Sequence, residues 1–163
     1  MRKMIVLPLL LALVLCSCGN KTVKKLSETA PSELIDDVYA ALSDGSDAAS
    51  YVPELVTTGI NEKTEEYYLG VKGVPYTAGA GSEAYVQPVT YSFSVIYLGK
   101  EADWDAERIK IEQNVNKSKW VCAAAEEALV VRYENVIAVI MGTKTVCGEL
   151  EKAFLSVVSS MEP

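Results

Sequence analysis

The feature that most limits what this chain can fold into lies in its first 17 residues. Arg2 and Lys3 precede an apolar run from Ile5 to Leu15 that is interrupted only by Pro8. A helix that crosses a bilayer core needs about 20 apolar residues, so this run is too short to be a transmembrane anchor. A basic start followed by a short apolar run is typical of an export signal. We therefore expect the folded part of the protein to follow this segment and to lie outside the cytoplasm.

The end of this segment, Leu15-Cys16-Ser17-Cys18, resembles the lipobox of bacterial lipoproteins. Leu15 stands three positions before Cys18 and the small Ser17 directly before it, whereas Cys16 would follow the bulky Leu15. The resemblance implies that residues 1–17 are removed as a lipoprotein signal peptide and that Cys18 receives a diacylglyceryl group. Two acyl chains of the palmitate type hold a protein stably on a membrane, where one does not. Ordinary signal cleavage that leaves Cys18 unmodified is the alternative.

The charge composition removes several classes of function. The 163 residues include 15 Lys and Arg, 22 Asp and Glu, and no histidine. Without histidine the chain cannot build a Ser-His-Asp triad, a Cys-His pair or a zinc site that needs imidazole. Removal of residues 1–17 leaves 146 residues with a side-chain charge of −9. Such an acidic domain is not expected to bind nucleic acid, whose partners present clustered Lys and Arg.

The mature chain divides into a tether and one domain. Residues 18–31 are polar and are predicted to be a lipid-anchored tether, whose lysines at 21, 24 and 25 are either solvated or close to anionic headgroups. Residues 32–163 form a single domain. Apolar spacing predicts helices over 32–42, 103–116 and 146–161, strands over 65–71 and 91–97, and a hairpin over 129–141 that turns at Glu134-Asn135. A turn of helix and then a loop are expected over 51–60. The Gly- and Pro-rich stretch 71–88 is expected to be a long connection, either functional or disordered.

This order predicts an α+β fold, with an antiparallel sheet of three to four strands packed with N-terminal, middle and C-terminal helices. In the strand over 91–97, period 2 places Tyr91, Phe93, Val95 and Tyr97 on one face, which is expected to be core. Trp104 and Trp120 are expected to be core or anchoring residues of the middle helix and its exit.

The stretch from Ser92 to Phe154 shows a second resemblance. It runs through a strand, a helix led by Asp103, the segment 116–126, a hairpin that ends in Val139-Ile140-Met141, and a last helix. This order is similar to that of uncharacterised lipoproteins of Gram-positive bacteria that share a single small domain of unknown function. The resemblance covers about half of the chain. It implies that the protein is localised as a lipoprotein and has an α+β fold, and it implies no activity.

Two thiols remain once Cys18 is lipidated, those of Cys122 and Cys147. A disulfide between them is allowed in an extracytoplasmic compartment. Two unpaired, structural cysteines are the reading that we favour, because cysteine also packs as a small apolar residue. A catalytic thiol is not expected, since no histidine is present to activate it and no CxxC motif occurs.

Carboxylates are numerous, in the runs 62–66, 101–107 and 126–127. Glycoside hydrolysis needs two carboxylates and no histidine, so a histidine-free hydrolase acting on envelope glycans is the alternative function that stays open. The run 101–107 lacks the spacing and the glycine of a calcium-binding loop. We therefore predict no metal site, no cofactor and no catalytic residue, and expect these acids to be solvated caps and turns.

Tyrosine is the enriched side chain, with nine copies against two Phe and two Trp. Tyr67, Tyr68, Tyr76 and Tyr85 lie in or near the stretch 71–88, and tyrosine is favoured at contact surfaces. These four are candidates for partner binding, with packing of the loop onto the core as the alternative. The sequence thus predicts a non-enzymatic lipoprotein on the outer face of the cell membrane. It would act as a binding or accessory module of the envelope for a protein or small ligand.

Overall fold

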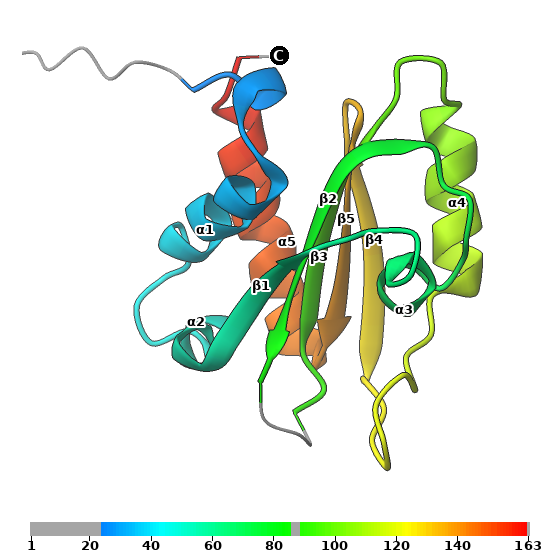
Figure 1. Cartoon of the computed structure of the whole chain (residues 1–163). Coiled ribbons are helices and arrows are strands. Elements are labelled where there is room, and N and C mark those ends of the chain that lie inside the picture. The colour runs from blue at the N-terminus through cyan, green and yellow to red at the C-terminus, as the bar shows by residue number, and fades with distance from the viewer. Residues whose placement is uncertain (1–23, 86–88, 163) are drawn as a thin grey trace, which may run out of the picture.

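A computed structural model describes residues 24–85 and 89–162 of the chain. Its centre is one open antiparallel sheet in the order β1-β2-β3-β5-β4 (Figure 1). The strands are β1 (Leu55–Gly59), β2 (Tyr76–Ala84), β3 (Ser92–Leu98), β4 (Glu127–Tyr133) and β5 (Val136–Gly142). The described helices are α1 (Pro31–Ala40), α2 (Asp47–Tyr51), α3 (Glu65–Leu69), α4 (Trp104–Asn114) and α5 (Lys144–Ser159), with 3₁₀ turns η1 (Leu26–Glu28) and η2 (Val52–Glu54). Within the described ranges, none of these helices combines the length and the apolar character that a membrane span requires.

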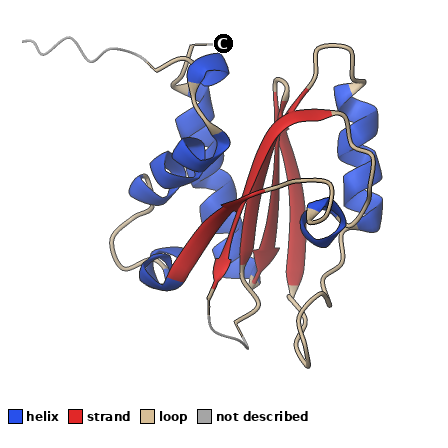
Figure 2. Ribbon diagram, viewed as in Figure 1, coloured by secondary structure: helices blue, strands red, loops and turns tan. Residues whose placement is uncertain are grey.

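Helices cover both faces of the sheet (Figure 2). α1 and α5 pack on one face and α2 packs against α5, while α3 and α4 pack on the other face. The alternating side chains of β3 separate the two cores. Phe93 and Val95 enter the core beneath α1 and α5, and Ile96 and Leu98 enter the core beneath α3 and α4. The sheet is therefore the middle layer of three.

The α+β class and the antiparallel sheet are confirmed, as are the three main helices and the hairpin. The face predicted for β3 is also confirmed, since Tyr91, Phe93, Val95 and Tyr97 all belong to one core. Asp103 begins α4 as expected, because its side chain accepts a hydrogen bond from the amide of Ala106 at 3.0 Å. The hairpin turns at Glu134-Asn135, where Glu134 takes a φ of 48°.

The strand count was too low, because the sheet has five strands. The strand predicted over 65–71 is wrong, since this segment is α3. The segment 51–60 was predicted to be a turn of helix and then a loop. The structure has the 3₁₀ turn η2 there, followed by β1, and the expected connection 71–88 contains β2. The glycines that suggested a loop are packing residues of β2. A Cβ on Gly81 would lie 2.4 Å from the ring of Tyr68, and a Cβ on Gly79 would lie 2.9 Å from Ile96. Only glycine allows α3 and the neighbouring strand to approach β2 so closely.

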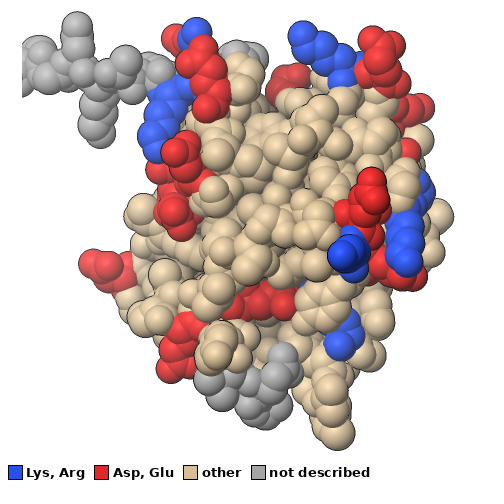
Figure 3. All heavy atoms as spheres, in the orientation of Figure 1, with Lys and Arg blue, Asp and Glu red and all other residues tan. Residues whose placement is uncertain are grey.

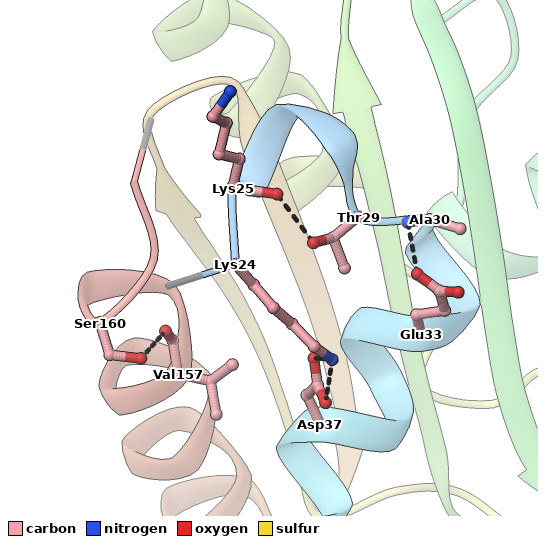
Figure 4. A network of polar contacts seen from close by, with 8 residues as sticks. All are labelled: Lys24, Lys25, Thr29, Ala30, Glu33, Asp37, Val157 and Ser160. Carbon is pink, nitrogen blue, oxygen red and sulfur yellow. Dashed lines mark hydrogen bonds and ion pairs between the residues drawn. The ribbon is translucent and has the colours of Figure 1, made fainter. Parts of the chain in front are cut away.

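The predicted tether is too long at its C-terminal end, because residues 24–31 belong to the folded domain. Leu26 is 2% exposed and belongs to the core beneath α1 and α5. Figure 4 shows how this segment is held: the ammonium of Lys24 donates to Asp37 of α1 at 2.6 and 2.8 Å, and the Thr29 hydroxyl donates to the carbonyl of Lys25 at 2.8 Å. A single apolar side chain among lysines carries no period, so the sequence pattern could not reveal this contact.

Candidate functional site

The most unusual side chain on the α3–α4 face is Lys119, which is 3% exposed although it carries a charge. Its ammonium lies 4.2 Å from the ring centre of Tyr67 and 5.0 Å from the ring centres of Tyr68 and Trp120. It also donates a hydrogen bond to the Ser92 hydroxyl at 3.0 Å. Aromatic faces attract a cation most strongly where water is excluded. The three rings therefore form a cage that the protein fills with its own lysine.

The counter-ion of this lysine is Glu83 of β2, which is 16% exposed. One carboxylate oxygen of Glu83 forms the ion pair with Lys119 and has no further hydrogen bond within the described residues. The other oxygen accepts a hydrogen bond from the Tyr67 hydroxyl at 2.9 Å. We call Lys119, Glu83, Tyr67, Tyr68 and Trp120 the Lys119 cluster. Its charges cancel locally, as the burial of an ion requires.

The surroundings of the cluster shift three pKa values. Burial lowers the pKa of Lys119, and the attraction of Glu83 opposes this shift. Burial raises the pKa of Tyr67, and both the charge and the hydrogen bond of Glu83 raise it further. Burial also raises the pKa of Tyr68, whose hydroxyl lies 3.0 Å from that of Thr58. At neutral pH the cluster therefore holds two neutral phenols around one ion pair.

The structure brings together two of the four candidate tyrosines. Tyr67 and Tyr68 meet edge to face, with ring centres 5.2 Å apart, in the Lys119 cluster. Tyr76 lies elsewhere: it is half-buried against the core beneath α3 and α4 and lines an open hollow of about 760 Å³ together with Glu62 and Lys63. Tyr85 is 83% exposed beyond the end of β2. The four tyrosines therefore do not form one patch.

Three of the six large apolar side chains that are exposed in the described part of the chain lie towards one end of the molecule. Tyr85 follows β2, Val121 is 81% exposed in the connection between α4 and β4, and Val56 is 46% exposed on β1 directly opposite Glu83. Figure 1 shows the ends of β2 and of the α4–β4 connection at the bottom of the view. The described chain begins and ends at the top, where the backbone of Lys25 pairs with that of Glu162. We call the end that carries Tyr85 and Val121 the distal end.

Cys122 and Cys147 are both free thiols in the structure. Cys122 is exposed and takes a φ of 62° in the connection at the distal end. Cys147 is fully buried in α5, and this burial raises the pKa of its thiol to about 12. A thiol of this kind is a packing residue rather than a nucleophile. Cys18 lies outside the described residues.

The buried Glu65 and the half-buried Glu83 are both engaged in the fold. Glu65, which is 5% exposed, accepts a hydrogen bond from the amide of Val74 at 2.7 Å and so fixes the turn after α3. Glu83 is the counter-ion of Lys119. In the part of the chain that the structure describes, no group of three or more Cys, Asp or Glu side chains is placed to hold a metal ion.

Sequence reasoning singled out Tyr67, Tyr68 and Trp120 but missed Lys119 and Glu83, the charged pair of the Lys119 cluster. Lys119 follows Lys117 and Ser118 in a segment that has the composition of a solvated loop, and Glu83 lies in a stretch that was expected to be irregular. The neighbouring Trp120 was the one local signal, since a tryptophan in a polar segment is often buried. Comparison of the chain with protein-family models, with curated proteins and with solved structures gave no match in any of the three.

Proposed function

We propose that this protein is a lipoprotein anchored through Cys18 on the outer face of the cell membrane, where it acts as a non-enzymatic binding or accessory module of the envelope. The observation that carries this proposal is the lipobox that ends in Cys18, preceded by a basic start and a short apolar run. Diacylglyceryl on Cys18 would supply the two acyl chains that stable anchoring needs.

The fold supports an orientation on the membrane. Lys24 is fixed to α1 through Asp37, so only residues 18–23 separate the anchor from the folded domain. Six residues extend to about 20 Å at most. The end of the molecule that carries Lys24 and Glu162 would therefore lie near the membrane, and the distal end would face away from it (Figure 1).

The distal end also has the composition of a contact surface. Tyr85 and Val121 are each more than four-fifths exposed there. Contact surfaces are enriched in aromatic side chains. Exposed apolar side chains are unfavourable in water, and a partner that covers them removes this unfavourable free energy. A module held by a short tether would thus present its apolar side chains to partners in the envelope.

The anchor is tested by membrane fractionation of cells that produce Cys18→Ser, with Cys16→Ser as the matched control. We expect the Cys18→Ser protein to leave the detergent-soluble membrane fraction, because it cannot receive the lipid, and Cys16→Ser to stay there. Equal fractionation of both variants would refute the lipoprotein assignment.

The binding role is tested with a photo-crosslinking side chain placed at Tyr85 in living cells. The matched control carries it at Leu155, which is 37% exposed on α5. We expect a discrete crosslinked product from position 85 and none from position 155. A diffuse smear from both positions would contradict a defined partner.

A further inference from the structure

The hydrogen bonds between β1 and β2 determine which backbone groups of β1 point outward. The amide of Tyr85 donates to the carbonyl of Glu54, and the amide of Ile60 donates to the carbonyl of Gly79. In an antiparallel pair such bonds join every second residue. The register pairs Leu55 with Ala84 and continues residue by residue, so the even-numbered residues of β1 face β2. The odd-numbered residues Leu55, Thr57 and Gly59 therefore direct their backbone groups away from the sheet.

These outward groups lie at an edge of the sheet, because β2 is the one strand among the described residues that pairs with β1. Within the described ranges, the backbone of Thr57 and Gly59 makes no hydrogen bond to a turn, a loop or another element. Only the amide of Leu55 is engaged, by the carbonyl of Val52. The edge thus offers two amides and three carbonyls at the spacing of a strand.

The β1 edge lacks the features that normally protect an edge strand. Its sequence Leu-Val-Thr-Thr-Gly contains no charged residue, no proline and no bulge. The opposite edge is protected: β4 carries Arg132, which is ion-paired with Asp105 of α4 at 2.9 Å. Figure 3, which has the same viewpoint as Figure 1, shows uncharged surface in the middle of the view and acidic side chains below it.

A hollow of about 480 Å³ lies beside the start of β1, where the described end of β2 pairs with it. It is lined by Pro53, Glu54, Leu55, Val56 and Tyr85. Among the described residues of this lining, Glu54 is the one that carries a charge, and it is exposed. A long basic side chain could extend its apolar stem along Tyr85 and place its charge at Glu54.

We propose that the β1 edge binds an extended segment of another envelope protein, which adds to the sheet as an antiparallel sixth strand. The segment is uncharged in its middle, where it meets Thr57, and has Lys or Arg at its C-terminal end, where it meets Glu54. Backbone hydrogen bonds give such strand addition its affinity, and side-chain pockets give it its specificity. This inference rests on the proposed binding role and specifies the partner for it.

A second copy of the chain fits the same edge less well than a different protein. Two β1 strands that pair antiparallel are related by a two-fold axis perpendicular to the sheet, so their membrane-proximal ends point in opposite directions. The short segment 18–23 could then not reach one membrane from both copies. The occupant that suits an anchored protein is therefore a strand from another chain.

The test uses the purified lipoprotein in detergent micelles and a synthetic heptapeptide of alternating Thr and Val that ends in Lys. Amide hydrogen exchange is followed by NMR, and affinity by fluorescence anisotropy. We expect the peptide to slow the exchange of the Thr57 and Gly59 amides. Methylation of the peptide nitrogen that faces Thr57 should weaken binding about tenfold or more, because it removes one hydrogen bond and blocks close approach. Methylation of the next nitrogen, which faces away, should change affinity less than threefold.

Two protein variants complete the design. Thr57→Pro removes the outward amide and should abolish binding, whereas Thr57→Val keeps that amide and should bind like the native protein, both with native melting curves. Equal binding of the two methylated peptides, or no slowed exchange at millimolar peptide, would overturn the inference. Sedimentation as a dimer, with Thr57→Cys crosslinking to its own copy, would also overturn it. A crosslinked partner at Tyr85 that persists in Thr57→Pro would refute strand addition and leave the proposed binding role intact.

Discussion

The Lys119 cluster gives the sharpest prediction for stability. Lys119→Met keeps most of the side-chain volume and removes the charge, so Glu83 is left 16% exposed without its cation. Removal of one partner of a buried ion pair costs about 3–5 kcal/mol. Glu83 keeps its hydrogen bond from Tyr67 and some contact with water, so we expect the lower end, about 3 kcal/mol. For a domain of this size that loss lowers the melting temperature by about 6–12 °C.

The assay is a double-mutant cycle measured by urea unfolding. Glu83→Gln alone should also cost about 3 kcal/mol, because it leaves Lys119 buried without a counter-ion. Lys119→Met combined with Glu83→Gln should recover to within about 1 kcal/mol of the native protein, since a buried pair replaced as a whole is often near neutral. The matched control is Lys72→Met. Lys72 pairs with Glu66 at 3.0 Å, but the two side chains are 66% and 62% exposed, so the loss should stay below about 1 kcal/mol.

The pH dependence of Glu83→Gln supplies a second readout. Burial lowers the folded-state pKa of Lys119, so the unfolded chain binds the proton more tightly. The contribution of Lys119 to the free energy of unfolding should therefore rise as the pH approaches 10.5, and it should rise more in Glu83→Gln, which lacks the opposing carboxylate. The stability difference between the native protein and Glu83→Gln should thus shrink over this range, in which the other titrating groups act on both proteins alike. Additive losses in the double mutant, or a Lys119→Met protein as stable as Lys72→Met, would refute the view that these two charges stabilise each other.

Three further predictions test packing and ionisation. Gly81→Ala should destabilise the protein by about 1–3 kcal/mol, because its Cβ would clash with the Tyr68 ring. A Cβ on Gly148 of α5 would meet nothing within 4 Å, so Gly148→Ala should stabilise the protein by about 0.5–1 kcal/mol. Urea unfolding measures both changes. Maleimide should label the exposed Cys122 rapidly and the buried Cys147 only after unfolding, as mass spectrometry with and without urea would show. Burial raises the pKa values of both Cys147 and Tyr68, so the folded protein holds these two protons more tightly than the unfolded chain does. Their contribution to the free energy of unfolding should therefore be constant below about pH 9 and fall above it. Unfolding curves measured at stepped pH would show this.

The parts of the fold that could be predicted from sequence are those with regular apolar spacing. The last helix places Leu150, Phe154 and Val158 on one face, and all three are fully buried. The strand over 91–97 shows period 2, and the structure uses that alternation to separate its two cores. In both cases local spacing and tertiary packing agree, so the apolar pattern was sufficient to predict the element and its buried face.

The missed elements are those in which tertiary contacts override local preference. β2 contains Gly79 and Gly81, which lower the strand propensity of this segment. The same glycines leave the space in which Ile96 and Tyr68 pack closely against β2. α3 has only five residues, too few for a helical period to show. Their contacts come from residues distant along the chain, which no local pattern reports.

The Lys119 cluster is connected to the β1 edge through β2. Gly81 of β2 lets Tyr68 approach the sheet, and Tyr68 in turn forms one wall of the cage around Lys119. Glu83, two residues further along β2, is the counter-ion of that lysine and lies directly opposite Val56 of β1. The ion pair thus anchors both the α4–β4 connection and α3 to the strand that supports β1. A sheet edge can bind an added strand only if its own strand is held firmly, and the buried pair supplies that support from beneath. Lys119→Met should therefore weaken binding of the heptapeptide at the β1 edge, although Lys119 lies on the other side of β2 from that edge. Lys72→Met should leave the binding of the heptapeptide unchanged.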